Sequence, residues 1–165
     1  RPAALVGNWK RELCGWHNIR LKRAEAYIHA GRYEEAETDL GVIITEQPEH
    51  AIGVHARFDL GQVHMALGNY ETALTVYTDL VEREPHAAKA YCNRGIAQSK
   101  LGAQEAAVAD LSKALLLDPD LTMAYGSRAI ALIALDRRDE ACQDLVQARE
   151  RGDASMDETL VIYCL

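Results

Sequence analysis

Cysteine and histidine are the residue types in this chain that could most readily bind a metal or act as nucleophiles. The chain has four cysteines and six histidines. Cys14 and His17 stand three residues apart, a spacing that metal ligands use, but no second pair accompanies them. The histidines show no pairing at metal-ligand spacing on one helical face. The sequence therefore predicts no metal site and no cofactor.

Patterns typical of catalysis are also missing from the sequence. It has no Gly-rich phosphate loop, no nucleophile elbow and no pair of carboxylates set in an apolar run. The acidic pairs Glu34-Glu35 and Asp139-Glu140 stand where helices are expected to begin, and there they favour the positive end of the helix dipole. We predict that this chain is not an enzyme by itself.

The composition and net charge of the chain indicate which kinds of partner it is unsuited to bind. The chain has 165 residues, 48% of them hydrophobic, which is enough for one domain with a continuous core. Its 18 basic and 25 acidic residues give a net charge of −7, without a basic stripe. This balance argues against nucleic acid and anionic lipid as partners.

Two features of the sequence concern where the protein is located: its longest apolar runs and its first residues. No apolar run approaches the roughly 18 residues that a membrane span requires, so we expect no direct membrane insertion of this segment. The chain begins with Arg1-Pro2 rather than Met, and we expect a fragment or a processed product whose upstream targeting or anchor segment is missing. Cytoplasm and periplasm both stay open.

The helices that would position any site are predicted from a pattern that repeats every 34 residues. Residues 88–121 contain two helical patterns that are joined at Gly102 and closed by Pro119. A step back of 34 residues reaches Gly68 and Pro85, and a further 37 reaches Gly31 and Pro48. Small residues recur in the same register, at Ala24, Gly61, Gly95 and Ala129 and again at Ala36, Ala73, Ala107 and Ala141.

This pattern resembles the tetratricopeptide repeat over residues 17–153. The resemblance implies an all-α, right-handed superhelix, an α-solenoid of four helix-turn-helix units at 17–53, 54–87, 88–121 and 122–153. Residues 1–16 and 154–165 are expected to form flanking capping helices. In the fourth unit Asp136 replaces the turn glycine, so we expect a less sharp boundary there. Ala51, Ile52 and Gly53 are extra residues and are expected to lengthen the link to the second unit.

The two flanking segments carry their own patterns. Leu5, Trp9, Leu13 and Trp16 would share one face of a helix that starts near Asn8. That helix either caps the first repeat, continues from an upstream domain or membrane helix, or docks on another copy. At the other end, a helix over residues 155–163 is expected, with Ser155 and Glu158 as a capping box.

Cys142 and Cys164 lie at equal distances from the expected turn at Gly152-Asp153, so antiparallel helices would place them side by side. The segment from residue 140 to 153, followed by Tyr163-Cys164, also resembles the closing repeat of many bacterial tetratricopeptide proteins. In an oxidising compartment a disulfide would attach the capping helix. In a reducing one both residues would be small buried apolar groups.

The first helix of each pair is expected to line a concave groove. The repeat register places on it Asn18, Leu21, Lys22, Glu25, His55, Phe58, Asp59, Gln62, Lys89, Cys92, Asn93, Ile96, Lys100, Met123, Ser127 and Ile130. An extended peptide or an amphipathic helix could bind there, with Phe58, Ile96 and Met123 as apolar anchors and Lys22, Lys89 and Asn93 as polar contacts. Alternatively, about half of the apolar members bury against neighbouring first helices.

The resemblance implies a scaffold that binds another protein. Some members of the family hold an acidic C-terminus in a carboxylate clamp, but only Lys89, with Asn93 in an alternative register, fits that pattern. Two alternatives remain: a self-associating structural module that forms a homo-oligomer, and a regulatory or recruiting part of a larger, membrane-anchored protein. The sequence does not name the partner, the cellular process or the oligomeric state.

Overall fold

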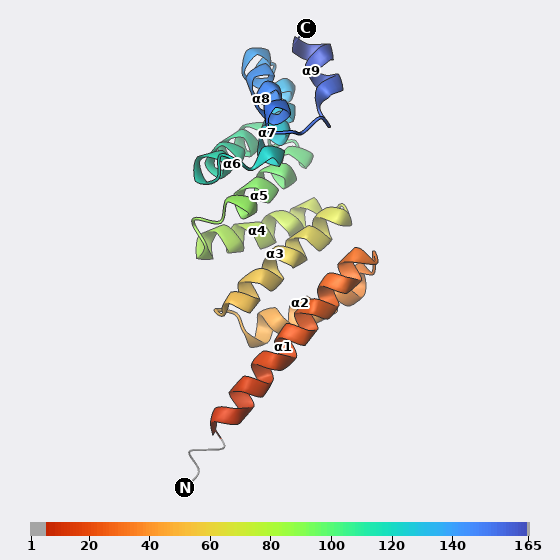
Figure 1. Ribbon diagram of the computed structural model, residues 1–165, viewed down its shortest axis with the longest axis vertical. Helices are drawn as coiled ribbons and strands as arrows, with labels where there is room; N and C mark the ends of the chain where they lie inside the picture. Colours follow the sequence, from red (N-terminus) through yellow and green to blue (C-terminus); the bar gives the residue numbers. More distant parts are fainter. Residues whose placement is uncertain (1–5, 165) are drawn as a thin grey trace. The chain divides into compact units, whose positions relative to one another are not determined.

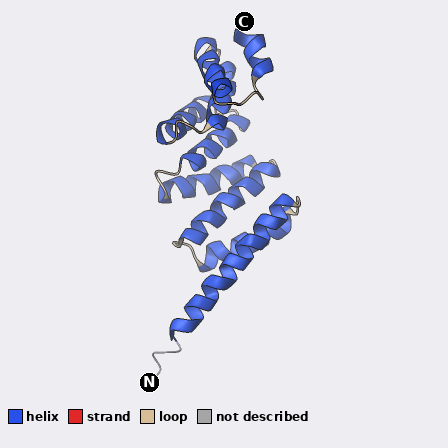
Figure 2. Ribbon diagram, in the orientation of Figure 1, coloured by secondary structure: helices blue, strands red, loops and turns tan. Residues whose placement is uncertain are grey.

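The computed structural model describes residues 6–164, with side chains from Gly15 onward. Over this range the chain forms nine helices and no strand (Figures 1 and 2). In order they are α1 (Val6–His29), α2 (Tyr33–Glu46), α3 (Ala51–Ala66), α4 (Tyr70–Arg83), α5 (Ala88–Lys100), α6 (Gln104–Leu117), α7 (Thr122–Ala134), α8 (Arg138–Glu150) and α9 (Asp157–Cys164). The expected all-α fold of helix pairs is confirmed.

The helices fall into two compact units. The first ends at Asn69 and contains α1 to α3, and the second begins at Tyr70 and contains α4 to α9. Within each unit, helices that follow one another along the chain pack together, and α1 also packs on α3 and α5 on α7. Each first helix therefore borders the first helix of the next pair in the same unit.

Small residues allow these helices to approach closely. Ala24, Ala107 and Ala141 have no exposed surface. Gly95 on α5 marks the tightest place, because a Cβ atom there would lie 2.8 Å from Cγ of Leu111 and 3.1 Å from the carbonyl oxygen of Ala107. Even an alanine at this position would push α6 away from α5.

An ion pair with a buried aspartate joins the two helices of three repeats. In each, an arginine on the first helix donates two hydrogen bonds to an aspartate 16 residues later on the second, and the shorter of the two is 2.6 or 2.7 Å long. The aspartates are buried. Bidentate pairs of this kind fix orientation as well as distance. The pairs are Arg23–Asp39, Arg94–Asp110 and Arg128–Asp144.

These pairs were not predicted from the sequence, although an arginine followed 16 residues later by an aspartate recurs in phase with the repeat. In the first repeat, the hydrogen bond from Arg23 lowers the pKa of the Asp39 carboxyl, which keeps it ionised. The second repeat has Leu60 and Val76 at the corresponding positions. Both positions of the pair are thus apolar in the second repeat.

Asp136 forms as sharp a turn as the glycine of the preceding repeat, so the expected loose boundary was wrong. Its φ is 58°, in the left-handed region, and Gly102 has a φ of 83°. At both turns the next amide donates to the carbonyl five residues earlier, from Ala103 to Gln98 and from Arg137 to Leu132. This is the Schellman arrangement, and aspartate tolerates its left-handed backbone better than most residues do.

Two helices begin earlier than expected. Residues 6–29 form the single helix α1, rather than a capping helix followed by a first-repeat helix. No proline interrupts this stretch, and an interior glycine such as Gly15 costs only about 1 kcal/mol. The extra residues Ala51 to Gly53 do not lengthen a link, because they form the first turn of α3. Leu5 and the side chains of Trp9 and Leu13 lie outside the described residues, and Trp16 is 67% exposed.

The last helix begins at Asp157, two residues later than expected, and the predicted capping box is not formed. Instead, the carboxylate of Asp153 accepts a hydrogen bond of 2.9 Å from the Ser155 amide, which holds that segment in a turn. Leu160 of α9 is buried against α7 and α8, together with Leu132 and Leu145. The helix therefore covers the apolar end of the fourth repeat.

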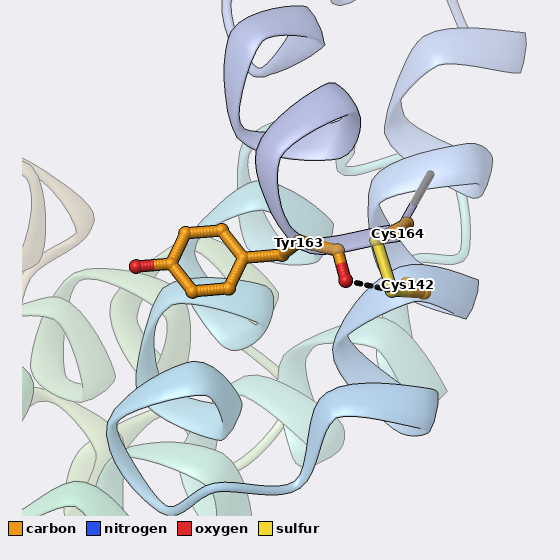
Figure 3. Close-up of a disulfide and its surroundings, with 3 residues drawn as sticks. All are labelled: Cys142, Tyr163 and Cys164. Carbon is orange, nitrogen blue, oxygen red and sulfur yellow. Dashed lines mark hydrogen bonds between the residues drawn. A yellow bond between two sulfur atoms is a disulfide. The ribbon is translucent and has the colours of Figure 1, made fainter.

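The structure places a disulfide between Cys142 of α8 and Cys164 of α9, with Cα atoms 5.6 Å apart (Figure 3). Sγ of Cys142 lies 3.7 Å from the Tyr163 carbonyl oxygen, and this is a contact only, since a disulfide sulfur carries no proton. The Tyr163 ring extends away from the disulfide. The bond closes a loop of 22 residues around the turn after α8.

We predict that Asp144→Asn lowers the free energy of unfolding by about 3 kcal/mol, because it leaves the partly buried Arg128 guanidinium without its carboxylate. Replacing both members, Arg128→Leu with Asp144→Val, copies the second repeat and should recover most of that loss. Urea unfolding of the three proteins measures this. A double variant less stable than Asp144→Asn would contradict the account.

We predict that Cys142→Ser combined with Cys164→Ser lowers the free energy of unfolding by about 3 kcal/mol, the entropy that closing a loop of this length removes from the unfolded chain. Amide exchange should rise mainly in α9. Reductant should cause the same loss in the wild type and no change in the double variant, which serves as the control. Equal unfolding curves of the wild type with and without reductant would show that the bond contributes no stability.

Candidate functional site

The predicted groove residues of the first unit lie on α1 and α3. Lys22, His55 and Gln62 are exposed, whereas Glu25 and Phe58 are half-buried. Leu21 is a core residue, packed in the cluster that contains Ala24 and Leu40. Leu21 therefore offers no surface to a ligand, as the alternative of burial between helices had anticipated.

Four of these residues form a charged cluster between α1 and α3. Lys22 donates a hydrogen bond of 2.7 Å to Oε2 of Glu25, and Nε2 of His55 lies 3.8 Å from Oδ2 of Asp59. Asp59 is only 7% exposed, and its Oδ2 has no hydrogen-bond partner. Burial raises the pKa of the Asp59 carboxyl, because ionisation there is poorly compensated.

The sequence predicted no metal site, and three members of this cluster nevertheless bring possible ligand atoms close together. Glu25, His55 and Asp59 each offer a ligand atom, and the three atoms lie within 4.8 Å of one another. His55 and Asp59 are four residues apart on α3 and so share a face, a signal that the sequence contains. The approach of Glu25 depends on the contact between α1 and α3, which no local pattern reveals.

In the second unit, α5 offers fewer accessible groups than predicted. Lys89 and Lys100 are exposed, but the side-chain amide of Asn93 donates to the Tyr77 hydroxyl oxygen at 3.1 Å. Ile96 packs partly against the core. Cys92 has no exposed surface, and burial raises the pKa of its thiol to about 12, so it stays protonated and unreactive.

On α7 the predicted residues form an apolar surface. Met123 is 51% exposed and Ile130 is 47% exposed, and with the half-buried Ser127 they recur at helical spacing on one face. The side chain of Met156, from the segment before α9, approaches Gly126 on this face, where an added Cβ would lie 3.3 Å from its Cγ. The segment between α8 and α9 therefore borders this surface.

The structure does not complete the carboxylate clamp. The clamp pattern asks for a basic residue where this chain has Leu21, which is apolar and buried. The Asn93 side-chain amide already donates a hydrogen bond to the Tyr77 hydroxyl oxygen. Among the described residues, no helix is both long and apolar enough to span a bilayer.

Comparison with known proteins places the repeats in a family. One tetratricopeptide-repeat model matches residues 58–122 and a second matches residues 20–50. The human small glutamine-rich tetratricopeptide repeat-containing protein beta is 50% identical over 44 residues, which are 27% of this chain and 14% of that protein. The match thus spans a small part of that curated relative.

Solved structures share the fold. MamA from Desulfovibrio magneticus RS-1 superposes with a TM-score of 0.74 and 22% identity, over 84% of this chain and 78% of that one. The TPR2B domain of yeast Sti1, in its pHsp70 complex, gives a TM-score of 0.63 with 26% identity, over 68% of this chain and 94% of the domain. With two repeat models matched over more than half of its length, the chain belongs to the tetratricopeptide-repeat family.

Proposed function

We propose that this chain binds a segment of a partner protein on the face of its second unit that α5 and α7 share. A role in protein interaction is supported by the family and by the likeness to the Sti1 domain in its pHsp70 complex. The role is one of binding rather than catalysis. The observation that carries the proposal is the pair of large apolar side chains, Met123 and Ile130, about half exposed on one face of α7.

The chemistry of this face indicates what it would bind. Met123 and Ile130 suit apolar side chains that recur at helical or extended spacing in a ligand, and methionine adapts to differing shapes. Lys89 and Lys100 on the neighbouring α5 are exposed cations. An amphipathic helix or extended peptide with acidic residues beside its apolar ones would complement both features.

Other predicted groove residues would contribute less to binding on this face, or belong to the first unit. Ile96 is half-buried and would form the floor of the face rather than an anchor that projects from it. Phe58 and Lys22 lie in the first unit, and they stay predicted contacts for that unit on its own.

A peptide library displayed on phage and selected on the whole chain supplies ligands for the test. We predict that Met123→Ala combined with Ile130→Ala weakens the selected peptides by about tenfold or more, as expected for truncating two interface anchors. Fluorescence anisotropy with labelled peptide measures the dissociation constants.

The matched control is Leu116→Ala. Leu116 is 75% exposed but lies on α6, the second helix of its pair. This variant should bind the peptides as the wild type does. A loss of affinity in Leu116→Ala, with none in the α7 variant, would place the ligand on the other side of the repeats and refute the proposal.

A further inference from the structure

We propose that Glu25, His55 and Asp59 form a site for one divalent transition-metal ion in the first unit. The three residues come from two helices that pack together, with Glu25 on α1 and the other two on α3. One ligand atom from each lies within 4.8 Å of the others. Zinc–ligand bonds of about 2.0 to 2.2 Å place ligand atoms roughly 3 to 4 Å apart, so small side-chain rotations would complete the site.

The buried carboxylate oxygen of Asp59 is the observation that points to a cation. Its Oδ2 has no hydrogen-bond partner, and Asp59 is more than nine-tenths buried. Buried polar atoms are almost always paired, and an unpaired carboxylate is among the most costly groups to bury. The His55 ring nitrogen at 3.8 Å is too distant for a hydrogen bond, and Lys22 bonds to Glu25 instead. A bound cation would give Oδ2 the partner that it lacks.

The ligand types select the class of ion. Two carboxylates with one imidazole suit zinc, cobalt, nickel or manganese, whereas calcium and magnesium prefer oxygen ligands alone. The His55 side chain is 57% exposed, so it can turn toward the ion, and the site stays open to solvent on that side. Three protein ligands with open positions leave room for water or for a carboxylate of a bound protein.

Calorimetric titration of the chelator-treated whole chain with Zn²⁺ tests the site, and Co²⁺ absorption gives a second readout of coordination. We expect one ion per chain. His55→Ala and Asp59→Asn should each weaken binding by about tenfold or more. The control is His86→Ala, which removes an exposed histidine in the second unit and should bind as the wild type does.

Thermal unfolding separates loss of the site from loss of the fold. Without metal, Asp59→Asn should melt at the same temperature as the wild type or higher, because it removes a buried charge. Zn²⁺ should raise the melting temperature of the wild type but not of this variant.

Equal Zn²⁺ affinity in His55→Ala, Asp59→Asn and His86→Ala would overturn the proposal. The absence of Zn²⁺ binding in the wild type would overturn it as well. If a lysine peptide then bound the wild type and not Asp59→Asn, the Asp59 carboxylate would be assigned to a cationic side chain of a protein partner. Neither result bears on the α5 and α7 face, which is tested by its own variants.

Discussion

Close approach between paired helices is the constraint on which the rest of this structure depends. The seam between α5 and α6 has no space for a Cβ atom at Gly95, and the equivalent residues of the first and fourth repeats, Ala24 and Ala129, have no exposed surface. The missing Cβ atom at Gly95 leaves room for the Leu111 side chain of α6, which is fully buried. On α7, by contrast, the side chains of Met123 and Ile130 are about half exposed.

The arginine–aspartate pairs between helices restrict the relative orientation of the two helices in a repeat. Small residues alone permit two helices to slide or rotate, whereas a bidentate pair between them fits one relative orientation. Such a pair is not needed for every repeat, because replacing both members by apolar residues is often neutral or stabilising. Leu60 and Val76 in the second repeat are consistent with that exchange.

The sequence predicted the helix pairs well, because their determinants are local and recur in one register. The wrong predictions concern places where the same local sequence is compatible with two backbone structures. No breaker stands between residues 6 and 29, so α1 runs on, and aspartate at residue 136 can adopt the backbone that glycine usually supplies. For α9, the Asp153 carboxylate holds the preceding turn and delays the helix.

The candidate sites were harder to predict because they depend on which face of a helix is covered. Leu21 and Cys92 fit the register of a groove but are buried by neighbouring helices. Glu25 and Asp59 come together only through the contact between α1 and α3, far apart in the sequence. The two units consequently present different chemistry on their first helices, a charged cluster in one and an apolar face beside lysines in the other.

Site-specific photocrosslinking tests the central claim, that ligands bind the first-helix face, most directly. A photoreactive amino acid would replace Met123 of α7 in one protein and Leu116 of α6 in another, since both positions are well exposed. With the same bound peptide, the account predicts a crosslink from position 123 and none from position 116. A crosslink from position 116 alone would show that the binding face has been assigned to the wrong helices.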